Sequence, residues 1–435
     1  MIDLIYLAQA DFKPELIEEK TIAKVQESGL MHSKVVGRFE TVQEPLKQTD
    51  NIDDIFSFID IYGTLRFAYI KSAHKISPKP NKLEKQATAV GGELGFNTAE
   101  FYGFSLHATA YASQSVNFLN PSKDDLNKDF FAKNLDSFVY LGEASLDYSS
   151  DAFQARLGRI KVETPYANSD DIRMAANTFE GASIDIQHTS KLKTEMIFLK
   201  RWAGYDSQDE DAGVFQNEFK NLVDDESFGM AGASFVYEYA KNSELTFWYN
   251  YVDKMSIISY LEAAGRYFIN GDFFHLDYGF QASNIQELSN SNVDGNVLGI
   301  MSIVHYQGVF FGGAYNVAIV DDGKYITNGF GGGPYYTSLD EATLAAISEA
   351  LPGDKAESYR VGVGYEFENL GVNGLVIELA YGELYNEKAS LHEKDVILTY
   401  EIADTWYLNA TYTNYESSSG HNSFDRALVR LDFRF

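Results

Sequence analysis

The chain has 435 residues, a formal net charge of −28 at pH 7 and no cysteine. The lack of cysteine excludes disulfides, zinc–thiolate sites and thiol nucleophiles, and the acidic charge argues against nucleic acid or anionic lipid as a partner of the bulk surface. No run of about 18 apolar residues occurs in the sequence, which excludes a transmembrane helix. The 29 Tyr and 31 Phe residues, against 3 Trp, instead fit the aromatic girdles of a membrane β-barrel.

The amino-terminal stretch is apolar and ends in Leu7-Ala8-Gln9-Ala10, an Ala-x-Ala pattern of the kind that signal peptidase cuts. Residues 1–10 are therefore interpreted as the remnant of a signal peptide, with a disordered tail as the alternative. Residues 11–58 have mixed charge and little alternation. We predict that they form a periplasmic N-terminal extension, and the alternative is a plug that enters the barrel.

From residue 59 to the end, apolar and polar side chains alternate with period two, as in strands with one face in lipid and one in water. In the last stretch Val429 and Leu431 alternate with Arg430 and Asp432, and Phe435 ends the chain in the apolar phase. The alternation is weaker in the segments 152–162 and 192–202. We expect eighteen strands, near residues 59–71, 87–98, 103–113, 137–149, 152–162, 180–189, 192–202, 230–240, 244–252, 257–269, 273–283, 296–306, 309–318, 358–368, 374–384, 394–402, 405–415 and 425–435.

The connections between these segments alternate between long and short. Long loops are expected at 72–86, 114–136, 163–179, 203–229, 284–295 and 319–357, and tight turns at 150–151, 241–243, 270–272 and 307–308. The connection at 253–256 is short where a long one is due. Sorting of turns to one end and loops to the other is typical of a membrane barrel and not of a soluble propeller or sandwich. We therefore predict an all-β fold, a transmembrane antiparallel β-barrel over residues 59–435, with short periplasmic turns and long extracellular loops.

The third long loop and the strand that leads into it carry the most informative motifs, which are Leu157-Gly158-Arg159, Thr164-Pro165, Ser169-Asp170-Asp171-Ile172-Arg173 and Asn177-Thr178-Phe179-Glu180-Gly181. They resemble the third-loop region of the OprD family of outer-membrane porins. The seventh loop, with Asn328-Gly329-Phe330-Gly331-Gly332-Gly333-Pro334-Tyr335-Tyr336, resembles its partner loop in that family. The resemblance implies an eighteen-stranded channel for small, often carboxylate-bearing solutes, in which these two loops form the constriction. The candidate constriction residues are Asp170, Asp171, Arg173, Tyr335 and Tyr336.

The second half of the seventh loop contains Ser338-Leu339-Asp340-Glu341, the pattern of a capping box. It predicts a short helix that begins here and continues to about Leu351, where Pro352-Gly353 would stop it.

Inward-facing arginines form a second group of candidates. Barrel closure would pair the last strand with the first and line up Arg66, Arg426, Arg430 and Arg434, with Asp432 interrupting the row. With Arg360 they make the predicted lumen basic wall. Facing the acidic residues of the third loop, this wall would create a transverse field that orients dipolar solutes such as amino acids. The alternative is that the arginines pair with lumen carboxylates such as Glu366, Glu378 and Glu401 and merely stiffen the wall.

The loop 203–229 carries eight acidic residues and a single lysine, Lys220. Calcium binding through carboxylate oxygens is one interpretation. The loop lacks an Asp-x-Asp-x-Asp-Gly pattern, so a solvated acidic rim is the favoured one. The acidic residues are Asp206, Asp209, Glu210, Asp211, Glu218, Asp224, Asp225 and Glu226.

The eight histidines are scattered singly, and the sequence has neither His-Glu-x-x-His nor Gly-x-Ser-x-Gly. We therefore expect no catalysis, no metal centre and no cofactor. His107 and His275 fall on the predicted lumen face, where a wet hydrogen-bonding side chain is the ordinary explanation.

Together these features predict an outer-membrane porin that lets small hydrophilic solutes, such as ions, amino acids and small carboxylates, diffuse passively. A non-conducting structural or adhesin barrel is the alternative. Outer-membrane lipid is the expected surroundings, no nucleic-acid partner is expected, and both a monomer and a homotrimer remain open.

Overall fold

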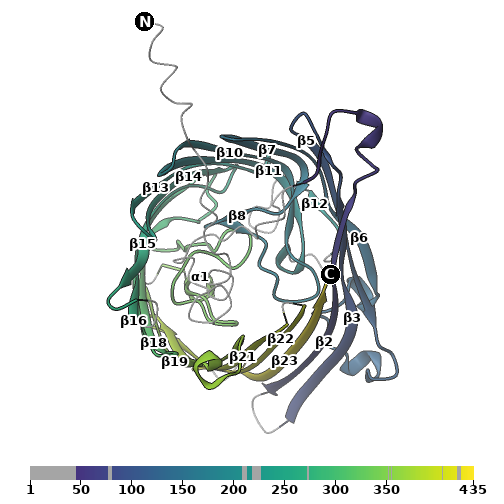
Figure 1. The fold of residues 1–435 in the computed structure, drawn as a ribbon. Helices are drawn as coiled ribbons and strands as arrows, with labels where there is room; N and C mark the ends of the chain where they lie inside the picture. Colours follow the sequence, from purple (N-terminus) through teal and green to yellow (C-terminus); the bar gives the residue numbers. More distant parts are fainter. Residues whose placement is uncertain are drawn as a thin grey trace, which may run out of the picture.

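The computed structural model describes residues 46–435 apart from 77–80, 208–212, 218–226, 272–273, 351, 354, 404 and 419–422. Within these residues the chain forms a closed antiparallel barrel of 18 strands, seen from one end in Figure 1. The barrel strands are β2 (Asp60–Ile76), β3 (Asn81–Asn97), β5 (Phe104–Ser115), β6 (Phe138–Ser150), β7 (Phe153–Ile160), β10 (Thr178–Thr189), β11 (Leu192–Ala203), β13 (Met230–Ala240), β14 (Ser243–Val252), β15 (Ser256–Phe268), β16 (Phe274–Glu287), β17 (Gly295–Tyr306), β18 (Val309–Ile319), β19 (Ala356–Glu366), β20 (Leu375–Tyr385), β21 (Ser390–Ile402), β22 (Trp406–Ser417) and β23 (Phe424–Arg434).

The barrel closes between its first and last strands. β2 and β23 pair antiparallel, with Thr64 opposite Arg434, Arg66 opposite Asp432 and Ser72 opposite Arg426. The predicted closure of the barrel is therefore confirmed. Closure matters in a bilayer because an open sheet edge would leave backbone groups unpaired in hydrocarbon.

Burial in the barrel is the reverse of that in a soluble protein. The inward side chains of Arg66 and Asp277 are 6% and 0% exposed, whereas the outward Leu65 and Phe280 are 53% and 60% exposed. The strand alternation predicted these faces, because neighbouring side chains of a strand point to opposite sides. The apolar face is the one available to lipid.

The first hairpin differs from the prediction. Residues 72–86 do not form a long loop, because β2 and β3 pair continuously as far as Ile76 opposite Asn81. Backbone pairing continues beyond the apolar alternation here, and it is supported by an ion pair between Lys71 and Glu84 at 2.9 Å. The part of a hairpin that extends beyond the bilayer can be polar on both faces. Apolar alternation therefore stops before the strands do, and the predicted strands were too short.

The described part of the predicted N-terminal extension lies at the short-turn end. β1 (Gln48–Thr49) pairs in parallel with β4 (Glu100–Phe101), and η4 (Ile52–Asp54) follows. The Ala99 N–H donates to the Ile55 carbonyl at 3.1 Å, which holds this segment against the turn between β3 and β5. The signal-peptide prediction for residues 1–10, and most of the prediction for 11–58 with its plug alternative, lie outside the described residues.

Two loops fold into the ring of strands. Loop 3 (161–177) contains the small sheet of β8 (Glu163–Thr164) and β9 (Ala167–Asn168), and loop 7 (320–355) contains α1 (Leu344–Ala350). Figure 1 shows β8 and α1 inside the barrel. The other short elements are η5 (Lys123–Asp125), η6 (Lys133–Leu135), η7 (Tyr205–Ser207), β12 (Gln216–Asn217) and η8 (Phe367–Leu370). No helix in the described part of the chain is long and apolar enough to cross a membrane.

The predicted capping box is wrong. α1 begins at Leu344, and its first turn is capped by Thr343, whose Oγ1 accepts the Ala346 N–H at 3.2 Å. The Ser338 carbonyl instead accepts a hydrogen bond from Arg360, and the Glu341 carboxylate accepts hydrogen bonds from Arg173 and Arg426. An unpaired buried arginine costs more free energy than one missing capping hydrogen bond at a short helix. Glu341 therefore pairs with the arginines and does not cap the helix.

Candidate pore constriction

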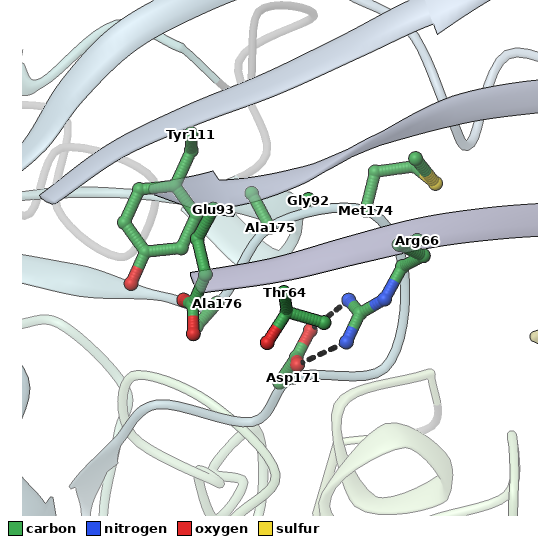
Figure 2. A pocket seen from close by; sticks show the side chains of 9 residues that line it. All are labelled: Thr64, Arg66, Gly92, Glu93, Tyr111, Asp171, Met174, Ala175 and Ala176. Atoms are coloured by element: carbon green, nitrogen blue, oxygen red, sulfur yellow. Dashed lines mark hydrogen bonds and ion pairs between the residues drawn. The ribbon is translucent and has the colours of Figure 1, made fainter. Parts of the chain in front are cut away.

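Loop 3 is attached to the barrel wall through Asp171. Arg66 of β2 donates to both oxygens of this carboxylate, at 2.7 and 2.8 Å, and to both oxygens of Asp432 at 2.8 Å. Its Nη1 also donates to the Arg173 carbonyl at 2.8 Å. Figure 2 shows the Arg66 guanidinium facing Asp171. Planar bidentate contacts of this kind fix position as well as charge, so the loop is held in one place against the wall.

Arg430 of β23 contacts the same part of the loop. Its Nη1 donates to the Asp171 carbonyl at 2.5 Å and lies 3.6 Å from the Asp171 carboxylate. Burial would raise the pKa of the Asp171 carboxyl, but the charges of Arg66, Arg430 and Lys161 and the hydrogen bonds from Arg66 more than offset this and hold the pKa well below its usual range. The Asp171 side chain is 41% exposed. A carboxylate with a lowered pKa therefore faces water beside two arginines.

The space between loop 3 and this wall is nearly filled. A cavity of about 10 Å³ remains there, and its lining includes Arg66, Tyr111, Asp171 and Met174 (Figure 2). That volume is about enough for one water molecule. Loop 3 therefore packs closely against the wall at this point.

Arg173 links the loops to one another. Its side chain is 1% exposed, its Nη2 donates to Glu341 of loop 7 at 3.0 Å, and its Nε lies 3.7 Å from Asp129 of the loop between β5 and β6. The guanidinium also lies over the Tyr205 ring, 4.7 Å from its centre. Arg173 is thus enclosed by three loops.

Loop 7 is held to the wall by charges on β23 and β21. Arg426 forms ion pairs with both Asp340 and Glu341. Burial would raise the pKa of the Asp340 carboxyl, but Arg426 and Arg173 lower it below its usual range. Glu393 accepts the backbone N–H groups of Glu341 and Ala342 at 2.9 and 2.7 Å, one with each oxygen.

The two loops also pair directly. Phe330 exchanges backbone hydrogen bonds with loop 3, donating to the Tyr166 carbonyl at 2.9 Å and accepting from Asn168 at 3.0 Å. Gly329 has a φ of 78°, and a Cβ there would lie 2.3 Å from the Tyr166 carbonyl oxygen. Glycine is therefore required for the contact, which gives the glycine-rich motif of loop 7 a physical reason.

Tyr335 and Tyr336 anchor loop 7. The Tyr335 hydroxyl donates to the Thr327 carbonyl at 2.8 Å, and the Tyr336 hydroxyl donates to Glu262 of β15 at 2.8 Å. Both rings are buried. Among the five predicted constriction residues, then, the structure exposes Asp171, half-buries Asp170, and encloses Arg173 and the two tyrosines.

The predicted basic wall consists mainly of paired arginines. Arg360 lies 3.4 Å from Glu378, as the stiffening alternative expected, and donates to the Ser338 carbonyl at 2.7 Å. Arg434 lies over the Tyr407 ring at 4.9 Å. Arg66 and Arg430 contact Asp171 of loop 3, the loop that was expected to face this wall. Arg426 pairs with Asp340 and Glu341 of loop 7, which the sequence pattern did not predict. Asp432 does more than interrupt the row, because it is a partner of Arg66.

Two groups of the described residues could hold a metal ion, His275-Asp277-His305 and Asp340-Glu393-Asp395. Of the acidic loop 203–229, Asp206 is described and accepts a bond from the Asn177 amide at 2.8 Å. The other acidic residues named for the calcium prediction lie outside the described residues. His107 is bonded to Asn97 at 2.7 Å, as expected of a lumen side chain.

Sequence reasoning missed several residues of the site, namely Asp129, Tyr166, Tyr205, Glu262, Asp340, Glu341 and Glu393. Their partners lie on other loops or on distant strands. The inward phase of Glu262 and Glu393 on their strands was the one signal that could have suggested them.

The comparisons with known proteins agree with this fold. The model of the OprD family of outer membrane porins matches residues 92–411. Similar solved structures include OpdK of Pseudomonas aeruginosa (TM-score 0.73, 14% identity, 88% of this chain and 99% of that one), OccK9 of the same organism (0.75, 14%, 88% and 100%) and OccAB4 of Acinetobacter baumannii (0.72, 15%, 87% and 98%). No curated protein matches the sequence.

The fold and the matched family define an outer-membrane porin. The chain belongs to the OprD family, as the loop motifs suggested.

Proposed function

We propose that this porin lets small hydrophilic solutes diffuse passively through a gap bounded by loops 3 and 7, past the carboxylate of Asp171. The observation that carries the proposal is the exposed, ionised Asp171 held beside Arg66 and Arg430 inside a closed barrel. Opposite charges that are fixed close together in a narrow site act on passing solutes through direct electrostatic contact.

The charges around Asp171 favour dipolar solutes. Arg66 and Arg430 stand against Asp171 and Asp432, so this part of the wall carries no net charge but a strong local field. Such a field orients zwitterions such as amino acids, because the ammonium group is attracted to the carboxylates and the carboxylate group to the arginines. Small carboxylates are the second solute class, and a structure of the similar porin OpdK contains vanillate.

The test is the reversal potential of single channels across a salt gradient, for the intact chain and for Asp171→Asn. The substitution removes one negative charge and leaves both arginines, so we expect the preference to shift toward anions. Asp151→Asn, in an exposed turn at the other end of the barrel, is the matched control and should leave the reversal potential unchanged. An unchanged value in Asp171→Asn would remove Asp171 from the solute path.

A non-conducting structural or adhesin barrel is the second candidate. The close packing of Arg173, Tyr335 and Tyr336 between the loops favours it. It predicts that folded protein inserted in a bilayer carries no current, and the same recordings therefore decide between the two.

A further inference from the structure

A cluster of buried side chains lies on the inner wall near the short turns, on strands that do not hold Asp171. His275 and Asp277 face inward from β16, and His305 faces inward from β17 directly opposite His275. The two imidazole rings are stacked with centres 4.2 Å apart. His305 Nε2 lies 3.2 Å from an Asp277 carboxylate oxygen, and all three side chains are buried.

We propose that these three residues form a binding site for a divalent transition metal of the zinc class. One donor atom from each residue lies within 4.8 Å of the others. Two imidazoles and one carboxylate are donors that Zn²⁺ accepts, and three protein ligands leave a fourth position for water. In a tetrahedral zinc site, bonds of about 2.0–2.1 Å place two ligand atoms about 3.3 Å apart. The 3.2 Å separation of His305 and Asp277 matches that spacing, and a ring nitrogen of His275 lies within 4.8 Å of a donor atom of each.

The surroundings support a preorganised site. Arg266 of β15 donates to both oxygens of Asp277, at 2.6 and 2.8 Å, which fixes the carboxylate plane. The Phe268 and Phe310 rings lie 5.8 and 5.6 Å from His275 and His305, and they limit where the imidazoles can turn. Supporting contacts of this kind orient metal ligands and tune their affinity.

The other acidic group, Asp340-Glu393-Asp395, is less suited to a metal. Asp340 is already paired with Arg426, and Glu393 accepts two backbone N–H groups. A cation there would disturb the attachment of loop 7 through Arg426, whereas the arginine that pairs with Asp277, Arg266, lies on a barrel strand.

The test is metal binding to folded, detergent-solubilised protein that carries a purification tag without histidine. We expect one Zn²⁺ per chain by calorimetry, and visible absorption typical of four-coordinate Co²⁺ when Co²⁺ is used instead. In His305→Gln and in Asp277→Asn the affinity should fall by at least about 100-fold. His107→Gln, another lumen histidine, is the control and should bind as the intact chain does.

Heat-modified mobility on gels establishes that each variant is a folded barrel, so lost binding reports on the site. Absence of stoichiometric binding to the folded intact chain would overturn the proposal. Equal affinity in His305→Gln would do the same, and the stacked pair would then be a hydrogen-bonding feature of the wall. Neither result depends on conduction, so the site and the proposed channel function are tested separately.

Discussion

At the scale of single residues, the interior is organised by arginines that meet carboxylates. A buried charge is costly unless it is paired, and removal of one partner of such a pair typically costs about 3–5 kcal/mol. Arg66 and Arg173 each contact anionic or carbonyl groups from two different segments, and Arg426 pairs with two neighbouring carboxylates of loop 7. The loops therefore depend on these pairs for their place in the barrel.

The attachment of both loops should resist mild acid. Asp171 and Asp340 have pKa values below those of ordinary aspartates, so each stabilises the folded loops fully above the unfolded pKa of about 4. That stabilisation is lost as the pH falls through the lower, folded pKa. We expect conductance and reversal potential to lack any step from these groups between pH 8 and about 4, measured on single channels. A step near pH 5–6 that is present in the intact chain and absent in Asp171→Asn would contradict this.

Arg173→Glu should loosen the contact between the loops. It places a negative charge beside Glu341 and Asp129 and removes the ring contact with Tyr205, at a cost of about 3–5 kcal/mol. The expected result is a larger and noisier open current in bilayer recordings. Lys128→Glu makes the same change of charge at an exposed position of a neighbouring loop and serves as the control. Equal currents from the two variants would show that Arg173 does not hold the loops.

At the scale of elements, loop 7 is anchored by strands far apart in sequence. β15 contributes Glu262, β21 contributes Glu393 and β23 contributes Arg426. The loop thereby becomes a fixed internal element, although α1 is its one α-helix in the described residues.

Glu393→Gln should free the start of loop 7. A glutamine keeps one acceptor oxygen and turns an NH₂ group toward the other backbone N–H, so one of the two bonds is lost at about 1–3 kcal/mol. Amide hydrogen exchange at Glu341 and Ala342 should become about 5- to 150-fold faster, as measured by mass spectrometry. Glu401→Gln on the same strand is the control. Unchanged exchange in Glu393→Gln would mean that the arginine pairs alone hold this segment.

The sequence allowed prediction of the strands because their physics is local. Arg66 and Phe67 alternate in the chain and therefore lie on opposite faces of the wall. Pairing of β2 with β23 followed from closure, and it placed Arg66 near Arg430 correctly. The end of the first hairpin was missed because pairing between Lys71 and Glu84 continues where apolar alternation has ceased.

The positions of the loops inside the barrel could not be predicted from local alternation. Motifs pointed to loops 3 and 7 through resemblance, but which charge meets which depends on three-dimensional closure. Glu341 was assigned to a capping box, whereas in the structure it is a partner of Arg426 and Arg173. The pairing of buried charges outweighed the local preference for a helix cap, and the spacing of residues in the sequence does not reveal such pairs.

At the scale of the whole molecule, the barrel separates two environments. Its outer face presents apolar and aromatic side chains such as Leu65 and Phe280, and its interior carries paired charges and two loops. The apolar outer face is therefore suited to lipid and the polar interior to water. Every barrel strand pairs with a neighbour on both sides, so no strand edge is left unpaired in the bilayer. A monomer and a homotrimer are both compatible with such a barrel.

The most direct test of the account is the current through single barrels in a planar bilayer, for the intact chain and for a variant in which residues 163–176 are replaced by a short Gly-Ser turn. We predict steady, ohmic channels from the intact chain and a larger conductance from the variant, because loop 3 lies inside the ring of strands and its removal should widen the path. No current from folded, inserted intact protein would contradict the channel. Equal conductance from the two would contradict the role of loop 3 as its constriction.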